Sequence, residues 1–432
     1  MDDRKADGRT FMRRLSRAAA FTAAVLVCLG AGVPHSAANP EAAAGQPPSV
    51  APNGGPAISV EINYLTKQYA EPPPLSLLDK VLTDEGVQGA RVALKENNMT
   101  GRLLNHTYTL KETIVPAKDD IAPSFKQLLA SGQRFFIANL EQPDLLAIAD
   151  LPEARDAIIL NVRASDDELR GANCRANLFH IIPSYAMRAD ALAQYLLWKK
   201  WRQWLLIAGQ KPEDLAYAAA IRRAAGRYGA KIVDERVYKY DAGSRRTDSG
   251  HQQIQTQMPM LTQGAPQHDV VFVADMSETF GDYLQYRTSV PRPVVGSHGL
   301  QALAWHRSFE QYAGTQMQNR FERAANRAMT ERDYTAWLGM RVFGEAVTRI
   351  SKSEAADVRA YMLSKEFGVA GFKGQGMTFR LWDNQMRQPM LLSGARALVS
   401  ISPQDGFLHQ KFLTDTLGYD EPETQCRMTK AN

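Results

Sequence analysis

Few residues in this sequence are arranged for catalysis. The chain has no G-x-S-x-G elbow for a nucleophilic serine, no H-E-x-x-H zinc motif and no G-x-x-x-x-G-K-[ST] phosphate loop. The eight histidines are scattered, and none pairs with another at the spacing of metal ligands. Cys174 lacks the local signature of a nucleophile. We therefore predict that the protein is not an enzyme and carries no cofactor.

Three acidic residues follow segments that we expect to be strands. These are Glu141, Asp166 and Asp275. Carboxylate oxygens are suitable ligands for a hard metal cation, provided that they converge. A carrier of such a cation is therefore an alternative that the sequence leaves open, although we predict no metal site. Convergence of the three side chains in the structure would favour the cation carrier over a protein without a metal site.

The N-terminus has the layout of a secretory signal peptide. Six basic residues lie among the first 17, an apolar run follows over residues 18–33, and Ser36-Ala37-Ala38 has the small-x-small pattern of a cleavage site. We predict removal of residues 1–38 and a mature protein in the periplasm. Residues 39–57, rich in Ala, Pro and Gly, are expected to form a flexible leader.

Other interpretations of the N-terminus fit less well. The apolar run is short for a membrane anchor, which needs about 20 residues, and it contains Gly30 and Gly32. The residues around Arg13-Arg14 fit a twin-arginine signal poorly. Val27 precedes Cys28 where a lipoprotein signal has a small residue. The general export route is therefore favoured.

The charge of the chain belongs largely to this signal. The formal net charge is +5, and basic residues predominate in the part that cleavage removes. The remaining charges of both signs are interspersed, so we expect no binding to nucleic acid. Cleavage also removes Cys28 and leaves Cys174 and Cys426 in an oxidising compartment. They form either one disulfide, which we favour, or two free thiols.

Strand and helix patterns alternate from Ile58 onward. The first half predicts strands at 58–65, 107–115, 135–140 and 157–162 with helices at 75–97, 124–130 and 144–154. The pattern then restarts with helices at 184–198, 212–228, 251–261 and 280–287 and strands at 204–208, 231–240, 270–274 and 294–296. Helices at 317–329, 333–350 and 355–364 follow, and then β segments at 377–382 and 395–401. This order predicts an α/β fold of two doubly wound, Rossmann-like lobes.

The order of elements and four phrases resemble the type I periplasmic binding proteins of the leucine/isoleucine/valine-binding group. The phrases are residues 181–184 with 190–193, 270–277, 334–338 with 344–346, and 372–376 leading to Phe379 and Asp383. The resemblance covers nearly all of the chain from Ile58. It implies two lobes joined by three crossovers, closing by a hinge on a small polar solute. Lobe 1 would comprise 58–182 with 304–370, and lobe 2 would comprise 183–303 with 371–432.

More narrowly, the chain resembles binding proteins associated with PQQ-dependent alcohol dehydrogenase systems. The phrases that carry this resemblance are 174–178, 251–255 and 309–321 with Gln316 and Arg320. The resemblance implies a metabolic context of periplasmic alcohol oxidation. It does not imply that this chain binds PQQ or oxidises a substrate.

In proteins of the family that this chain resembles, the residues that contact the ligand lie on loops after the strands. In lobe 1 the resemblance implies Tyr64, Glu141, Gln142, Ala164, Ser165 and Asp166, and in lobe 2 it implies Ser184, Tyr185, Asp275, Ser277, Ser297 and His298. Structural roles remain open for several of them, namely a helix cap for Ser184 or Glu141 and a solvated loop for Asp166.

Two positions depart from the pattern of amino-acid binders. Glu141-Gln142 stand where small hydroxyl residues usually meet a carboxylate, and Ser297-His298 stand where an acid usually holds the ammonium group. Glu141 would repel a carboxylate, so an ordinary aliphatic amino acid is not the expected solute.

We therefore predict the periplasmic solute-binding component of an ABC importer, monomeric and partnered by a membrane permease. Its solute is small and polar. The first alternative keeps the fold but makes the protein a sensor or regulatory binding protein; the second is the cation carrier described above.

Overall fold

The computed structural model describes residues 57–72, 80–239 and 250–428 of the chain. The predicted signal peptide and all of the predicted leader except Ala57 lie outside these residues. Within the described ranges, no helix combines the length and the apolar character that a membrane crossing needs.

The first sheet contains five parallel strands in the order β2-β1-β3-β4-β5. Its strands are β1 (Ile58–Lys67), β2 (His106–Val115), β3 (Phe135–Asn139), β4 (Ile158–Asn161) and β5 (Leu178–His180). Helices α1 (Val87–Leu104), α2 (Ile121–Ala130) and α3 (Gln142–Ala149) connect them. Because every strand is parallel, the carboxyl ends of all five lie at one edge of the sheet.

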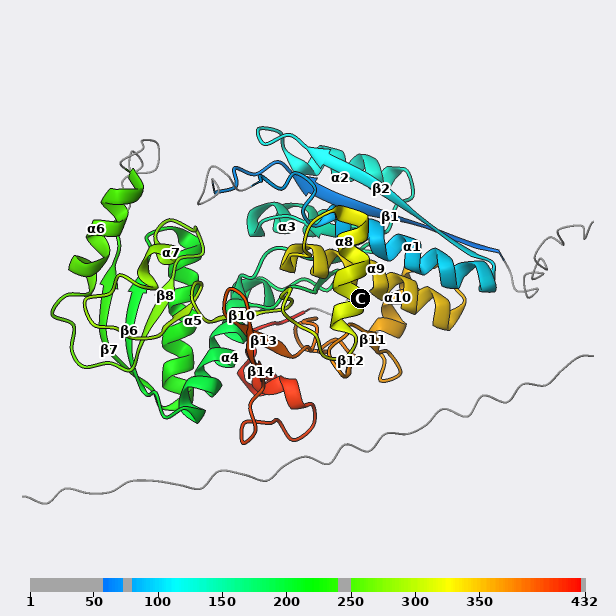
Figure 1. Ribbon diagram of the computed structural model, residues 1–432. Helices are drawn as coiled ribbons and strands as arrows, with labels where there is room; N and C mark the ends of the chain where they lie inside the picture. The colour runs from blue at the N-terminus through cyan, green and yellow to red at the C-terminus, as the bar shows by residue number, and fades with distance from the viewer. Residues whose placement is uncertain (1–56, 73–79, 240–249, 429–432) are drawn as a thin grey trace, which may run out of the picture. The chain divides into compact units, whose positions relative to one another are not determined.

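Both faces of this sheet are covered, which explains the continuous apolar run of β3. Phe135 and Ile137 pack into a cluster with residues of α1 and of the long helix α9 (Glu331–Ile350). Phe136 and Ala138 pack on the opposite face, against α2 and α3. Helices α1 and α9 lie side by side on the first of these faces (Figure 1).

The second sheet has four parallel strands in the order β7-β6-β8-β9. Its strands are β6 (Gln203–Ala208), β7 (Lys231–Val237), β8 (Val270–Ala274) and β9 (Val294–Gly296), and its helices are α4 (Tyr185–Trp198), α5 (Pro212–Tyr228), α6 (Gly250–Thr262) and α7 (Gly281–Leu284). Local capping residues bound two of these helices, and Ser184 has the capping role that the sequence left open. The Ser184 hydroxyl accepts from the Met187 N–H at 3.3 Å, and Gly229 ends α5 with a φ of +72°.

The rest of the chain contributes to both cores. It forms β10 (Gln301–Leu303), α8 (Gly314–Ala325), α9, α10 (Ala355–Met362), β11 (Val369–Ala370), β12 (Gly376–Met377), β13 (Met390–Ser393) and β14 (Leu398–Ser402). Strand β13 pairs antiparallel with β10 and β14. On β13, Leu391 joins the core cluster of the first sheet, while Met390 and Leu392 join that of the second. This strand therefore links the two lobes of the predicted α/β fold.

Two predicted elements differ from the structure. Of the helix expected over 75–97, residues 75–79 lie outside the described residues, and the described part becomes helical only at Val87, after Gly86 with a φ of +84°. A Cβ on Gly86 would also lie 2.3 Å from the Tyr64 hydroxyl. The strand expected over 377–382 ends at Met377, and Arg380 instead extends into a buried network of charges.

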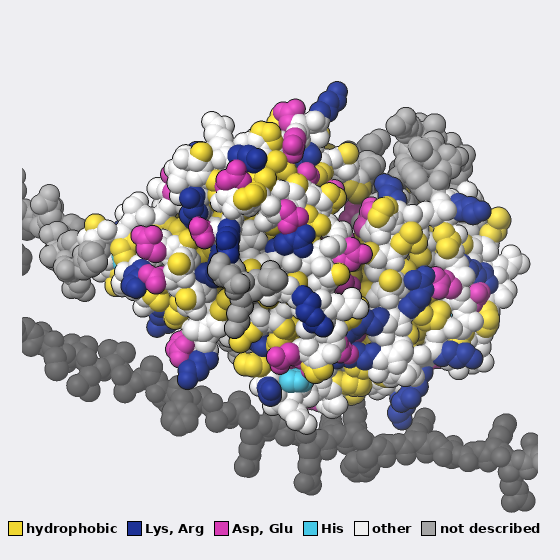
Figure 2. Space-filling view, turned by 180° about the vertical axis from the view of Figure 1, so that it is seen from behind, with side chains coloured by type: hydrophobic (Ala, Val, Ile, Leu, Met, Phe, Trp, Pro, Cys, Tyr) yellow, Lys and Arg dark blue, Asp and Glu magenta, His cyan; other side chains and the backbone are white. Residues whose placement is uncertain are grey.

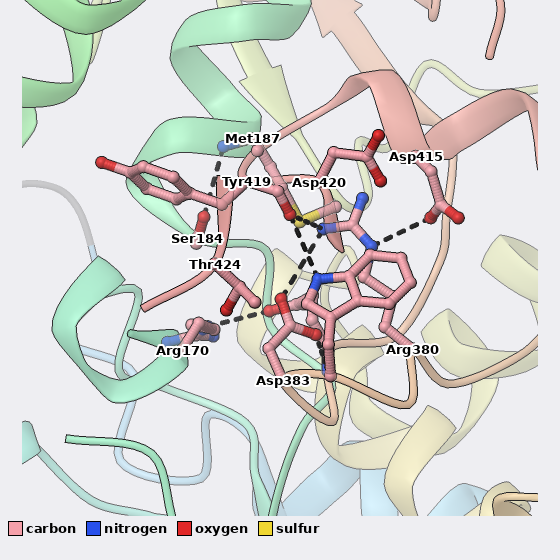
Figure 3. Close-up of polar contacts among 12 residues, drawn as sticks. Arg170, Ser184, Met187, Arg380, Asp383, Asp415, Tyr419, Asp420 and Thr424 are labelled. Atoms are coloured by element: carbon pink, nitrogen blue, oxygen red, sulfur yellow. Dashed lines mark hydrogen bonds and ion pairs between the residues drawn. The ribbon is translucent and has the colours of Figure 1, made fainter. Parts of the chain in front are cut away.

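The C-terminal segment is fixed by this network. The Asp415 carboxylate accepts from the Nε groups of Arg380 and Arg387, each at 2.9 Å, and Arg380 is only 1% exposed. Figure 3 shows Arg380 pointing toward Asp415, with a further bond to the Tyr419 carbonyl. A second buried carboxylate, Asp190 on α4, accepts from Arg223 and Arg227. Paired charges of this kind are costly to break because the remaining partner stays buried.

A disulfide closes the same region, as the sequence predicts. Cys174 and Cys426 are bonded, with their Cα atoms 5.6 Å apart and a sequence separation of 252. Both cysteines are buried. The bridge therefore ties the end of the chain to the loop before β5.

Removing this bridge should lower the stability of the protein. A cross-link that closes so long a loop contributes about 2–5 kcal/mol, chiefly by restricting the unfolded chain. We expect a lower melting temperature after reduction with dithiothreitol, measured by circular dichroism. The Cys174→Ser/Cys426→Ser variant should melt at the lower temperature with or without the reductant. Equal melting of the oxidised and reduced wild-type protein would contradict this expectation.

A buried lysine lies in the loop between β11 and β12. The Lys373 ammonium donates to the Gln388 side-chain oxygen and to the Pro389 carbonyl, both at 2.9 Å. It also lies 5.1 Å from the centre of the Tyr334 ring. Burial lowers the pKa of Lys373 to about 7.

The stability of the protein should consequently rise as the pH rises from about 7 toward 9. The pKa of a lysine in the unfolded chain is about 10.4, so the folded protein binds fewer protons than the unfolded one in this range. Urea unfolding at several pH values should show this slope, and Lys373→Met should flatten it. Lys365 is exposed, and Lys365→Met is the matched control that keeps the slope. An unchanged slope in Lys373→Met would refute the assignment.

Candidate functional site

Each parallel sheet has a cavity at the carboxyl ends of its strands. The first cavity, of about 340 Å³, is lined by residues that end β1 and β3 or follow β4, together with Arg332 of α9. The second, of about 300 Å³, is lined by residues that follow β8 and β9, together with Arg188 of α4 and Glu331 of α9. Ligands of open α/β sheets bind at this edge.

Arginine–carboxylate pairs dominate the first cavity. Arg163, two residues after the end of β4, binds Glu71 at 2.7 Å and Glu141 at 3.2 Å. Arg332 binds Glu85 at 2.9 Å and Glu71 at 3.2 Å. Burial opposes the ionisation of Glu71, but the neighbouring Arg332 and Arg163 outweigh it and lower the pKa of this carboxyl. The cavity therefore holds ionised groups of both signs.

Asn139 and Tyr64 form the floor of the first cavity. Asn139, the last residue of β3, donates its amide to the Thr66 hydroxyl at 3.0 Å. The Asn139 side-chain oxygen is buried and has no hydrogen-bond partner in the structure. A buried polar atom without a partner is costly, which makes it a candidate contact for a ligand. The Tyr64 hydroxyl donates to the Glu85 carbonyl at 3.4 Å, and burial raises the pKa of Tyr64.

Asp275 organises the loop that forms the wall of the second cavity. Its carboxylate accepts from the backbone N–H groups of Thr279, Phe280 and Gly281 at 2.6–2.9 Å. It also accepts from the Thr279 hydroxyl, and the Ser277 hydroxyl, which donates to Asp214, lies 3.3 Å away. With four donors around it, this carboxylate holds the 277–281 loop in place.

Ser297 and His298 form the adjoining wall, directly after β9. The Ser297 hydroxyl donates to the Val273 carbonyl at 3.2 Å and accepts from the Asp275 N–H at 2.9 Å. The His298 ring is buried with Nδ1 3.0 Å from that hydroxyl and Nε2 4.0 Å from Asp282. A Cβ on Gly281 would lie 2.1 Å from His298 Nδ1, so this glycine leaves room for the ring.

The start of α9 supplies a charged residue to each cavity. Glu331 accepts from Arg188 at 2.8 Å in the second cavity, whereas the next residue, Arg332, lines the first. Asp333 fixes this turn, because its buried carboxylate accepts from the Gly86 N–H at 2.8 Å, from Thr330 and from Arg327. The Arg188 Nε, which is also buried, has no partner in the structure.

Four of the residues implied by the resemblance line these cavities. Tyr64 lines the first, and Asp275, Ser297 and His298 line the second, with Met276 between them. Glu141 does not line the first cavity but binds Arg163, which does. It stands at the N-cap of α3 without a side-chain capping bond, and its charge is balanced by Arg163.

The other implied residues lie outside both cavities and have structural contacts. The carbonyls of Ala164 and Asp166 accept from the buried Arg170 guanidinium, and the Ser165 carbonyl accepts from the Tyr185 N–H. Ser184 caps α4, as described above. Gln142 donates to Glu168 at 3.3 Å, and the Ser277 hydroxyl donates to Asp214 at 2.9 Å.

Sequence reasoning missed most of the charged residues of the cavities. Arg163 and Asn139 could have been found, because Arg163 directly follows the predicted strand 157–162 and Asn139 is the last residue but one of the predicted strand 135–140. Glu71, Glu85, Arg188, Glu331 and Arg332 gave no such signal, since they come from helices or irregular segments that the fold brings to the strand ends.

The carboxylates that would define a cation carrier do not gather. Glu141 is bound to Arg163, and Asp275 is surrounded by its own loop. In the part of the chain that the structure describes, no group of three or more His, Cys, Asp or Glu side chains is placed to hold a metal ion.

Asp275→Asn should destabilise the protein, because an amide nitrogen cannot accept from the N–H groups of residues 279–281. A buried donor left unpaired costs about 1–3 kcal/mol. Asp282, whose side chain is 45% exposed in the same cavity, provides the control, and Asp282→Asn should cost less than about 0.5 kcal/mol. Chemical denaturation measures both. Equal stability of the two variants would mean that the Asp275 contacts do not hold the loop.

Comparison with known proteins agrees with this arrangement. The family model described as "Periplasmic binding protein" matches residues 85–397. A search of curated proteins by sequence found no match. Among solved structures, one similar protein is a branched chain amino acid ABC transporter periplasmic ligand-binding protein from Burkholderia xenovorans. It is 15% identical in sequence, with a TM-score of 0.65, and the match covers 86% of this chain and 100% of that protein's chain.

Two further structures show the same fold. The leucine-, isoleucine-, valine-, threonine-, and alanine-binding protein from Brucella ovis, in a closed conformation, is 14% identical with a TM-score of 0.62 and covers 87% of this chain and all of its own. An ABC transporter substrate-binding protein from Sphaerobacter thermophilus is 16% identical with a TM-score of 0.63 and covers 84% and 100%. The match over residues 85–397, together with the two-lobed α/β fold, shows that the chain belongs to the periplasmic binding protein family, whose members are binding proteins and not enzymes.

Proposed function

We propose that this protein is the solute-binding component of an ABC import system. It binds a small polar solute in the periplasm and presents the bound form to a membrane permease. The proteins of similar fold are named as ligand-binding or substrate-binding proteins of ABC transporters, which supports the proposal. Membership of the periplasmic binding protein family supports the periplasmic location.

The observation that carries the proposal is the pair of cavities at the strand ends. One lining residue of each cavity, Asn139 in the first and Arg188 in the second, has a buried polar side-chain atom without a hydrogen-bond partner in the structure. Adjacent residues of α9, Glu331 and Arg332, line one cavity each. A solute that contacts both lobes would stabilise the closed form, because binding energy is gained from the two sets of contacts together.

In this proposal, residues 58–182 with 304–370 form lobe 1, and residues 183–303 with 371–432 form lobe 2. Tyr64, Asp275, Ser297 and His298 line the solute site, and the remaining predicted site residues support the loops around it. Residues 1–38 act as a cleaved signal peptide, and the mature protein acts as a monomer. The phrases at 174–178, 251–255 and 309–321 support a link to PQQ-dependent alcohol oxidation.

Basic and acidic side chains are interspersed on the face shown in Figure 2. A nucleic-acid-binding surface would instead concentrate positive charge. The distribution on this face fits a small solute better than a nucleic acid as a partner.

A thermal-shift screen of the mature chain from Asn39 tests the proposal. The panel contains amino acids, small alcohols with their aldehydes and acids, PQQ and calcium. A true solute at 100 times its Kd should add about 2.7 kcal/mol to the stability. Asn139→Ala in the first cavity and His298→Ala in the second should each remove the shift while the protein remains folded. Lys365→Met, on the surface, should keep it.

The result also separates uptake from other roles. A shift that survives both cavity variants would place the solute elsewhere, and the absence of any shift would remove the support for solute uptake.

A further inference from the structure

Glu71 occupies an unusual position in the first cavity. Its carboxylate lies between two guanidinium groups, 2.7 Å from Arg163 and 3.2 Å from Arg332. The Glu71 side chain is 47% exposed, whereas those of Arg163 and Arg332 are 13% and 27% exposed. An acid reachable from solvent is thus held by two largely buried cations.

The two arginines do not depend on Glu71 for their positions. Arg163 also binds Glu141, and its guanidinium lies 4.7 Å from the centre of the Tyr69 ring. Tyr69 is itself fixed by a 2.6 Å hydrogen bond to Asp144. Arg332 keeps Glu85 as a partner at 2.9 Å and lies one residue before the buried Asp333. If Glu71 moved away, both cations would remain in place with one carboxylate partner each.

Glu71 lacks comparable support. It lies beyond the end of β1 in a segment without regular secondary structure. Among the residues that the structure describes, its side chain forms hydrogen bonds and ion pairs with the two arginines. This carboxylate is therefore the easier member of the cluster to displace.

We infer that Glu71 stands where the carboxylate of a small organic acid binds, and that the solute replaces it. This inference rests on the proposed function and names the solute class for the same site. The exchange leaves the charge of the cluster unchanged, since one carboxylate takes the place of another. It also needs little further desolvation of the arginines, which are already largely buried. Guanidinium groups bind carboxylates in a directional way through paired N–H donors.

Glu71 then acts as an internal competitor for the solute. Its removal should strengthen the binding of a carboxylate, because the free protein would no longer have to break two ion pairs. The same removal should leave the binding of an uncharged analogue almost unchanged.

The experiment measures acetate binding by calorimetry, at constant ionic strength, to the mature wild-type protein and to Glu71→Ala. We expect a Kd about tenfold lower in the variant. Glu112 provides a matched control, because it lines the same cavity and is bound by Arg91 at 2.7 Å instead of by the arginine pair. Glu112→Ala removes the same charge and should leave the acetate Kd unchanged. Acetamide, the neutral analogue, should not distinguish the three proteins.

A second variant tests the arginines directly. Arg332→Gln in the Glu71→Ala background should abolish the gain in acetate affinity, with folding verified by circular dichroism. Arg163→Gln serves the same purpose if Arg332→Gln does not fold. An equal acetate Kd in Glu71→Ala and Glu112→Ala would overturn the inference.

Failure of this inference is distinguishable from failure of the proposed function. If neutral or cationic solutes stabilise the wild-type protein through Asn139 and His298, but Glu71→Ala gains no affinity for acetate, the uptake role stands and the carboxylate class falls. If no solute binds to the wild-type protein and Glu71→Ala gains no affinity for acetate, both the uptake role and the carboxylate class are ruled out. A gain for acetate in Glu71→Ala that is absent in Glu112→Ala supports the anion site.

Discussion

The buried carboxylate of Asp333 is the contact on which the arrangement of charges depends. It caps the first turn of α9 together with Thr330, accepts from the Gly86 N–H before α1, and is paired with Arg327. The two residues before it, Glu331 and Arg332, thereby reach different cavities. A single helix terminus thus serves both lobes, and the geometry of the site is set by a group that contacts no solute in the proposed function. Its full burial makes the position of that turn insensitive to the solvent.

The two cavities differ in how their charges are balanced. In the first, Arg163 and Arg332 form ion pairs with three carboxylates. Some of these acidic side chains are exposed to solvent, so the ion pairs can rearrange at modest cost. In the second, the Asp275 carboxylate is enclosed by its own loop and keeps a fixed shape. One lobe therefore offers exchangeable ion pairs, and the other offers a rigid wall.

Much of the fold could be predicted from local patterns in the sequence. The apolar run 270–274 forms β8 with the expected bounds, and Ser184 and Gly229 bound their helices because capping is a local effect. The start of α1 could not be predicted, since it depends on the contact between Gly86 and Asp333 across 247 residues. Strands β5 and β10 were not predicted, although β9, which also has three residues, was. The dependence on tertiary contacts also limits the site: Asp275 follows a predicted strand and Tyr64 was implied by the resemblance, whereas Glu71 and Arg332 come together only through the tertiary fold.

The late segment of the chain has a consequence for the order in which the protein can be made. Leu391 of β13 and Leu417 complete the cores of the first and second sheets, and Cys426 closes the bridge to Cys174. Synthesis proceeds from the N-terminus, so the second core lacks Leu417 and the bridge lacks Cys426 until the chain is nearly finished. A chain of 380 residues would already contain every strand of both parallel sheets but would lack Leu391, Leu392 and Leu417 of their cores. A truncation late in the sequence would therefore remove parts of both cores and the bridge, although it spares both parallel sheets.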